Sequence, residues 1–170
     1  DGKGILDHTE ESLASIKERL DAAGIKVGSL GSPIGKYDIT ADFESYLVTF
    51  EKALRACEIL GTKKMRMFSF FVEQDKLAEH RDEVIRRLQI MVDLATERGI
   101  TLCHENESRI YGQMPREVDD LMGSVKGLKA IFDPANYRMN DGDVMAGIEA
   151  TLKNFAYLHI KDAVYQNQTI

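Results

Sequence analysis

The chain has 170 residues, a length that suits one globular domain with a sizeable core, and its 44% hydrophobic and 29% charged residues are an ordinary soluble composition. Its net charge of −6 argues against a nucleic-acid surface, which needs clustered basic residues, and no apolar run approaches the length of a membrane span. Residues 1–4 form no signal-peptide core, and Cys57 and Cys103 fit buried thiols in a reducing compartment, so we expect a cytoplasmic protein.

Apolar periodicity and glycine stops predict five helices that alternate with five strands. The first helix begins after Thr9, a suitable N-cap, and ends at Gly24. A strand at 25–30 follows and leads into a turn at 31–35. The remaining predicted helices cover about 42–60, 77 or 81–98, 116–122 and 144–154. The remaining predicted strands cover 65–71, 100–104, 128–132 and 155–160.

This alternation predicts an α/β fold, a parallel sheet covered by helices in a single domain spanning residues 1–170. A complete (β/α)8 TIM barrel needs ~250 residues. Five βα units that begin with a helix therefore indicate an incomplete barrel, lacking about two units before residue 1 and one after residue 170. An open, doubly wound sheet of five strands fits the same length, and periodicity alone leaves both topologies open.

Three successive predicted strands end directly in a residue type that binds metals. The strand at 100–104 runs into Glu105, the strand at 128–132 into Asp133, and residues 155–158 into His159. In parallel α/β proteins, active sites form at this end of the strands. Two carboxylates and an imidazole suit a divalent cation with open positions for substrate, such as Mn²⁺, Mg²⁺, Co²⁺ or Zn²⁺. The sequence therefore predicts one shared metal site.

Each of these residues also has a purely structural interpretation. A carboxylate such as Glu105 at a buried strand end is costly without a partner, which favours a functional role. Asp133 precedes a proline and is a common turn starter, Asn136 orients a ligand or caps that turn, and His159 in an apolar strand also fits a core histidine. Glu107 follows in the loop and reaches the same face as a substrate contact, although a helix cap or loop charge is the simpler explanation.

Further polar residues lie where a substrate would bind. Arg66 shares a strand face with Phe68 and Phe70, so it binds substrate or closes an ion pair in the core. Phe68, Phe70 and Phe71 form an apolar wall of a pocket or, as the simpler explanation, pack in the core. Lys161 lies on the face of the predicted imidazole ligand, and Asp162 caps or orients it.

The end of the first strand offers a place for a phosphate or hydroxyl group beside Ser32 and Lys36. The turn at 31–35 nevertheless lacks both the phosphate-loop pattern and the GxGxxG pattern. The sequence therefore does not support a nucleotide cofactor.

The strand-end motifs resemble a known family. Segments 104–107, 132–136 and 159–162 are similar to successive motifs of the sugar phosphate isomerase/epimerase family, the xylose isomerase-like barrels, and segments 31–36 and 66–70 resemble its bacterial members. A cation on two vicinal substrate oxygens stabilises an enediolate, so a nearby Glu can remove a proton beside a carbonyl. This is the chemistry of aldose–ketose isomerases and ketose epimerases.

The resemblance implies a (β/α)8 barrel whose divalent metal is held by Glu, Asp, His and a further Glu. Glu105 matches the first Glu, a ligand and acid/base, and Asp133 and His159 match the next two ligands. The final Glu, on the last strand, has no counterpart in this sequence. Asn136 stands where several relatives carry His. The His-rich metal cluster of the related abasic-site endonucleases is not visible, which argues further against nucleic acid.

The resulting hypothesis is a metal-dependent isomerase or epimerase that acts on a sugar, a sugar phosphate or a polyol ketone. Arg66, Asn136, Lys161 and Glu107 are its candidate substrate contacts. One alternative is an inosose-type dehydratase, since it too begins with proton abstraction beside a carbonyl. Another is a sugar-binding barrel fragment without turnover. The exposed edges of an incomplete sheet would also favour a homo-oligomer.

Overall fold

The computed structural model describes residues 2–161 of the chain, and Asp162, which the sequence predicts to cap or orient Lys161, lies outside them. Helices and strands alternate along the described chain. The elements are η1 (Ile5–Asp7), α1 (Glu10–Ala22), β1 (Leu30–Gly31), α2 (Phe43–Leu60), β2 (Lys64–Met67), η2 (Gln74–Lys76), α3 (Leu77–Glu97), β3 (Thr101–Glu105), η3 (Tyr111–Gln113), α4 (Pro115–Ser124), β4 (Lys129–Phe132), α5 (Pro134–Met139), α6 (Val144–Leu152) and β5 (Phe155–Leu158).

The five strands form one parallel sheet in the order β1-β2-β3-β4-β5. A doubly wound sheet reverses its strand order at a switch point, whereas sequential parallel strands are the arrangement of a barrel. The Tyr157 hydroxyl of β5 lies 3.0 Å from the Ser29 hydroxyl, just before β1. The two edge strands therefore curve toward each other, and the described strands form an arc of a barrel.

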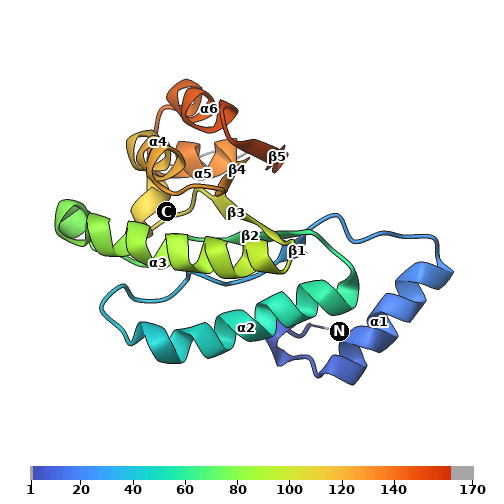
Figure 1. Cartoon of the computed structure of the whole chain (residues 1–170). Helices are drawn as coiled ribbons and strands as arrows, with labels where there is room; N and C mark the ends of the chain where they lie inside the picture. The colour runs from blue at the N-terminus through green and yellow to red at the C-terminus, as the bar shows by residue number, and fades with distance from the viewer. Residues whose placement is uncertain (1, 162–170) are drawn as a thin grey trace.

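Helices cover the outer face of this arc (Figure 1). α3 packs against β3 and α6 against β4, while α4 and α6 pack on each other. α2 lies beside α3, and α1 packs on α2 away from the sheet. None of the helices in residues 2–161 combines the length and apolar character that crossing a membrane requires.

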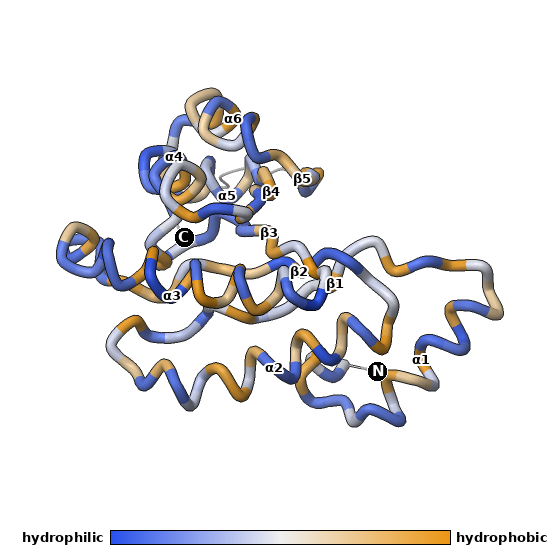
Figure 2. Tube along the Cα trace, in the orientation of Figure 1, coloured by the Kyte–Doolittle hydropathy of each residue, from blue (hydrophilic) through white to orange (hydrophobic). Residues whose placement is uncertain are grey.

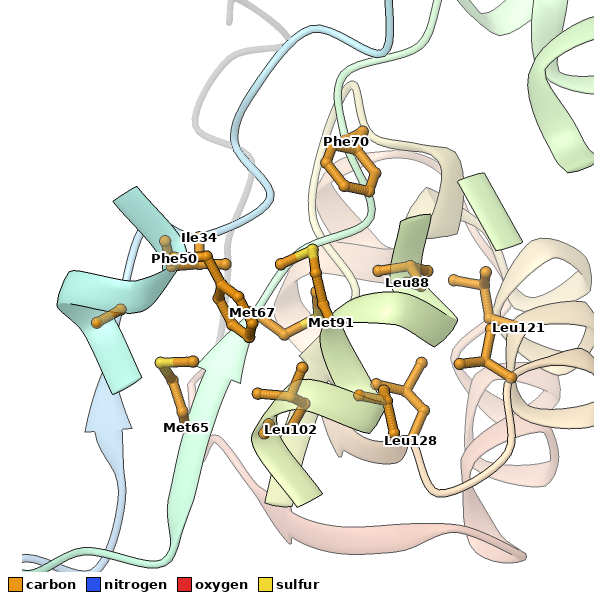
Figure 3. Close-up of a cluster of buried hydrophobic side chains, with 14 of the residues drawn as sticks. Ile34, Phe50, Met65, Met67, Phe70, Leu88, Met91, Leu102, Leu121 and Leu128 are labelled. Atoms are coloured by element: carbon orange, nitrogen blue, oxygen red, sulfur yellow. The ribbon is translucent and has the colours of Figure 1, made fainter. Parts of the chain in front are cut away.

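The hydrophobic core lies between the sheet and the helices (Figure 3). Met65 and Met67 of β2 contribute to it together with Leu88 and Met91 of α3, and all four are fully buried. Along α2 and α3, apolar residues alternate with polar ones, as expected for helices with one buried face (Figure 2). Because side chains alternate along a strand, Arg66 between the two methionines faces the inside of the arc.

Local capping explains why α1 and α2 begin as predicted and why α2 ends at Gly61. The Thr9 hydroxyl accepts a hydrogen bond from the Ser12 amide at the start of α1. The Asp42 carboxylate does the same for the Ser45 amide at the start of α2. Gly61 ends α2 with a φ of +70°, a left-handed conformation that glycine adopts without strain.

Three elements differ from the sequence prediction. The strand predicted at 25–30 is wrong except at its end, because residues 24–29 are largely exposed and the short β1 pairs only with β2 at the edge of the sheet. The strand predicted at 65–71 ends at Met67, since Phe70 has a φ of +68° that breaks the extended backbone. α5 is a short helix that periodicity does not predict, and it begins with Pro134 after an Asp133 cap.

Candidate metal centre

Three neighbouring strands bring the predicted ligands to one place. Glu105 is the last residue of β3, Asp133 follows β4, and His159 follows β5. Each offers a ligand atom, and these atoms lie within 4.8 Å of one another. Glu105 and Asp133 are 4% and 1% exposed, whereas His159 is half-buried. The structure therefore assembles the cluster that the strand-end pattern predicts.

The two buried carboxylates are held by nearby cationic or imidazole groups. Glu105 Oε1 lies 2.8 Å from His159 Nδ1, and its Oε2 lies 3.2 Å from a terminal guanidinium nitrogen of Arg66. Asp133 Oδ2 lies 3.0 Å from the Lys161 ammonium and 3.7 Å from His159 Nδ1. Because buried carboxylates are costly without a counter-charge, these contacts stabilise the cluster.

Asp133 serves the backbone and the cluster at the same time. Its Oδ1 accepts a hydrogen bond of 3.0 Å from the Asn136 amide and so caps the N-terminus of α5. Its Oδ2 faces Lys161 and the imidazole. The turn-starting interpretation of Asp133 is therefore correct, and the same residue also belongs to the cluster.

Asn106 clasps the ends of β3 and β4 together. Its side-chain amide donates to the Asp133 carbonyl at 2.9 Å, and its Oδ1 accepts from the Asp133 amide at 3.0 Å. The Asn136 side chain donates in turn to the Asn106 carbonyl at 2.8 Å. All three residues are buried. Sequence reasoning missed the role of Asn106, and its only signal is a polar residue placed directly after a strand-end ligand.

The residues beside Glu105 on β3 are not ligands. His104 points to the opposite face, where its Nε2 lies 2.9 Å from the Ser69 hydroxyl, and burial lowers the pKa of His104 to about 3. Cys103 is a free thiol, as predicted, and burial raises its pKa to about 11. Neither residue belongs to the group of possible metal ligands that the described residues form.

The donor set fits a divalent cation. Glu105 Oε2 is buried and makes no hydrogen bond with the described residues, because its contact with Arg66 is an ion pair without hydrogen-bond geometry. Two carboxylates and an imidazole on one side of the cluster suit Mg²⁺, Mn²⁺, Co²⁺ or Zn²⁺. A bound cation would satisfy the acceptor that the protein leaves unpaired.

The predicted substrate contacts fall into two groups. Arg66 and Lys161 touch the cluster directly, and the Lys161 ammonium also donates to Asn136 Oδ1 at 2.7 Å. Glu107 instead forms an ion pair of 3.1 Å with Lys36 and accepts a hydrogen bond from the amide of the next residue, 108. Arg66 thus forms an ion pair, as one of the two sequence interpretations predicts.

The phenylalanines after β2 do not share one face, contrary to the prediction. Phe68 lies beside Arg66, with the guanidinium carbon 5.0 Å from the ring centroid. Phe70 packs edge-on against Phe43 and Tyr46 in the hydrophobic core. The positive φ of Phe70 rotates its side chain out of the strand alternation, which explains the difference.

Comparisons with known proteins agree with this arrangement. The sequence model of a family described as the xylose isomerase-like TIM barrel matches residues 2–170. None of the curated proteins matches the chain.

Several solved structures share the fold at low sequence identity. A xylose isomerase domain protein from Planctomyces limnophilus has a TM-score of 0.74 and 19% identity, with 93% of this chain and 62% of that chain covered. A D-psicose 3-epimerase, solved in the presence of D-fructose, has a TM-score of 0.73 and 16% identity, with 91% and 59% covered. A probable 3-DHS dehydratase from Bacillus anthracis, involved in petrobactin synthesis, has a TM-score of 0.71 and 16% identity, with 88% and 55% covered. The chain thus spans less than two thirds of each.

Proposed function

The chain belongs to the xylose isomerase-like TIM barrel family, and from this premise we propose that it carries the metal-binding part of an isomerase or epimerase acting on a sugar, a sugar phosphate or a polyol ketone. The observation that carries the proposal is the convergence of Glu105, Asp133 and His159 at the ends of three adjacent strands. In barrels of this type, reactions take place at that end of the strands.

Each ligand residue has a distinct part in the proposed reaction. Glu105, Asp133 and His159 hold a divalent metal, which when bound supplies positive charge to the oxygen anion that develops beside the reacting carbon. Glu105 also takes the proton from the carbon next to the substrate carbonyl; in an isomerase it delivers this proton to the neighbouring carbon, whereas in an epimerase a second acid/base supplies a proton from the opposite face. Because Glu105 is buried, bulk water has little access to the proton that its carboxylate carries.

The remaining predicted residues position the substrate in this proposal. Lys161 and Asn136 are joined by a hydrogen bond of 2.7 Å, so they present a donor and an amide together beside Asp133. Arg66 approaches from the neighbouring side through its contact with Glu105. The second acid/base, a Glu that the family resemblance places on the last strand of a whole barrel, completes the reaction on the other face of the carbon.

Mn²⁺ binding and hydrogen exchange test this function. In isothermal titration calorimetry, we expect the chelator-treated chain to bind Mn²⁺, and Glu105→Gln to weaken binding by roughly 10–100-fold. In D₂O, exchange of the hydrogen beside the carbonyl of D-fructose, D-tagatose or D-psicose, followed by NMR, is expected to fall by about 10²-fold or more in Glu105→Gln. Glu97→Gln is the matched control, because Glu97 is exposed at the C-terminal end of α3, away from the cluster. Exchange that survives both chelation and Glu105→Gln would contradict the proposal.

A dehydratase is the second candidate, because one structure that shares the fold is a probable dehydratase. Both reactions begin with proton removal beside a carbonyl, but a dehydratase then expels a hydroxyl group from the next carbon as water. Loss of water from the product, detected by mass spectrometry, separates the two reactions. Mn²⁺-dependent sugar binding with no exchange and no water loss would instead identify a sugar-binding module.

A further inference from the structure

Two cations converge on one aromatic ring beside the candidate metal centre. The Lys36 ammonium lies 4.5 Å from the Phe68 ring centroid, and the Arg66 guanidinium carbon lies 5.0 Å from it. Lys36 comes from the loop after β1, whereas Arg66 belongs to β2. The two positive charges repel each other, so placing both beside one ring is favourable only where an anion lies between or beside them.

Neither cation is fully satisfied by its present partner. Arg66 is in ionic contact with Glu105 at 3.2 Å and donates to the Ser32 carbonyl at 3.2 Å, but its Nε is buried and has no hydrogen-bond partner within residues 2–161. Lys36 pairs with Glu107 at 3.1 Å, and its side chain is still 37% exposed. A metal that takes Glu105 as a ligand competes with Arg66 for that carboxylate, which leaves the guanidinium available to another anion.

The charge balance of the site points the same way. Its described acidic residues are Glu105, Glu107 and Asp133, and its described cations, Lys36, Arg66 and Lys161, cancel them one for one. A divalent cation bound there would add two positive charges, and the further Glu that the family resemblance places on the last strand of a whole barrel would offset one of them, which leaves an excess of positive charge when the imidazole is counted as neutral. A neutral sugar leaves this excess in a partly buried site, whereas an anionic substrate offsets it.

We propose that the substrate carries an acidic group, a carboxylate or a phosphate, which Arg66 and Lys36 bind beside Phe68. This inference rests on the proposed function, because it assigns the substrate class of the same site. The planar guanidinium binds either anion through paired hydrogen bonds, and the ammonium adds a second charge-assisted contact. The Phe68 ring holds both cations in place by cation–π contacts.

Calorimetry with matched ligands tests the proposal on the Mn²⁺-loaded chain. The ligands are D-fructose, D-fructuronate and D-fructose 6-phosphate, which differ in the group at one end of the same carbon skeleton. We expect at least one anionic ligand to bind roughly tenfold more tightly than D-fructose, and the preferred ligand distinguishes carboxylate from phosphate. Lys36→Gln is expected to remove most of this preference and to leave the Mn²⁺ affinity within about twofold, because Lys36 contacts no ligand residue.

Lys26→Gln is the matched control, since Lys26 is exposed in the segment before β1. Anionic ligands that bind no better than D-fructose, or not at all, would overturn the proposal. So would a preference that Lys36→Gln leaves intact, because the anion would then bind the metal alone. If Mn²⁺ still binds, neither result contradicts the proposed metal site. Absence of Mn²⁺ binding would overturn the proposed function as well.

Discussion

The pair of hydrogen bonds from Asn106 to the Asp133 backbone, the Asn106 clasp, gives a quantitative test of how the proposed metal ligands are positioned. Asn106→Ala removes both hydrogen bonds to the backbone of Asp133, at 2.9 and 3.0 Å. Asn106 is 1% exposed, so water does not readily replace the lost side chain. The Asp133 amide and carbonyl would be left buried without these partners.

The expected loss follows from the number of hydrogen bonds and from their burial. Each lost bond contributes about 1 kcal/mol, and buried groups left unpaired add a further desolvation cost, so the free energy of unfolding is expected to fall by about 2–4 kcal/mol. The clasp also fixes the spacing between Glu105 and Asp133, which are the residues on either side of it. Loss of a group that orients metal ligands typically weakens metal binding by about 10–100-fold, and we expect a loss in this range.

Two measurements on the same variant separate positioning from simple destabilisation. Urea unfolding of the chelated protein gives the stability change, and calorimetric Mn²⁺ titration at a temperature where the variant is folded gives the affinity. Asn154→Ala is the matched control, because the Asn154 side chain donates one hydrogen bond to the Met122 carbonyl at the far end of β5 from His159. This control is expected to lose about 1 kcal/mol of stability without a change in Mn²⁺ affinity.

If Asn106→Ala unfolds more easily but binds Mn²⁺ as tightly as the unmodified chain, the clasp does not position the proposed ligands. Equal losses of Mn²⁺ affinity in Asn106→Ala and Asn154→Ala would show that affinity follows global stability instead.

Three further predictions concern charge, burial and backbone geometry. Lys161→Met removes the ammonium beside Asp133 Oδ2. Calorimetry is therefore expected to show roughly tenfold tighter Mn²⁺ binding, while the free energy of unfolding of the chelated protein falls by about 1–2 kcal/mol. Weaker Mn²⁺ binding would contradict this prediction. Burial lowers the pKa of His104 to about 3, so below pH 6.5 only the unfolded state takes up a proton on this imidazole. The contribution of His104 to the free energy of unfolding is complete above pH 6.5 and falls by about 2 kcal/mol at pH 5. Urea unfolding of His104→Gln is expected to lack that loss. Gly35→Ala places a methyl carbon 2.0 Å from the Phe68 carbonyl oxygen, at a residue with a φ of +87°. In urea unfolding, this variant is expected to lose about 3 kcal/mol or more of its free energy of unfolding. Gly28→Ala is the control, because the carbon added there meets no atom within 4 Å.

Sequence patterns predicted those features that depend on local chemistry. The start of α2 follows from Asp42, an N-cap residue, and its end follows from Gly61 in the left-handed conformation. The cluster of Glu105 and Asp133 was predictable because parallel strands place their ends at one edge. A residue type and its distance from a strand end are sufficient for inferences of this kind.

Features that depend on distant parts of the chain were not predictable. Phe70 has high strand propensity, yet it adopts a positive φ because its amide donates to the Gly35 carbonyl from another loop. The strand expected at 25–30 lacks a partner along most of its length, since β1 lies at the sheet edge. Asn106 acquires its role only from the backbone of Asp133, 27 residues away.

The same long-range contacts hold the residues of the candidate metal centre. Asp133 is fixed by the Asn106 clasp and by its own capping bond to α5, and neither contact requires a metal. Arg66 and Lys161 meanwhile supply positive charge to the two ligand carboxylates. Glu105 and Asp133 are therefore held in position by contacts within the protein, in contrast to the ligands of small zinc domains that fold only around their metal. We infer that Mn²⁺ raises the stability of this chain only by mass action on a folded protein, with an increase set by its concentration relative to its dissociation constant.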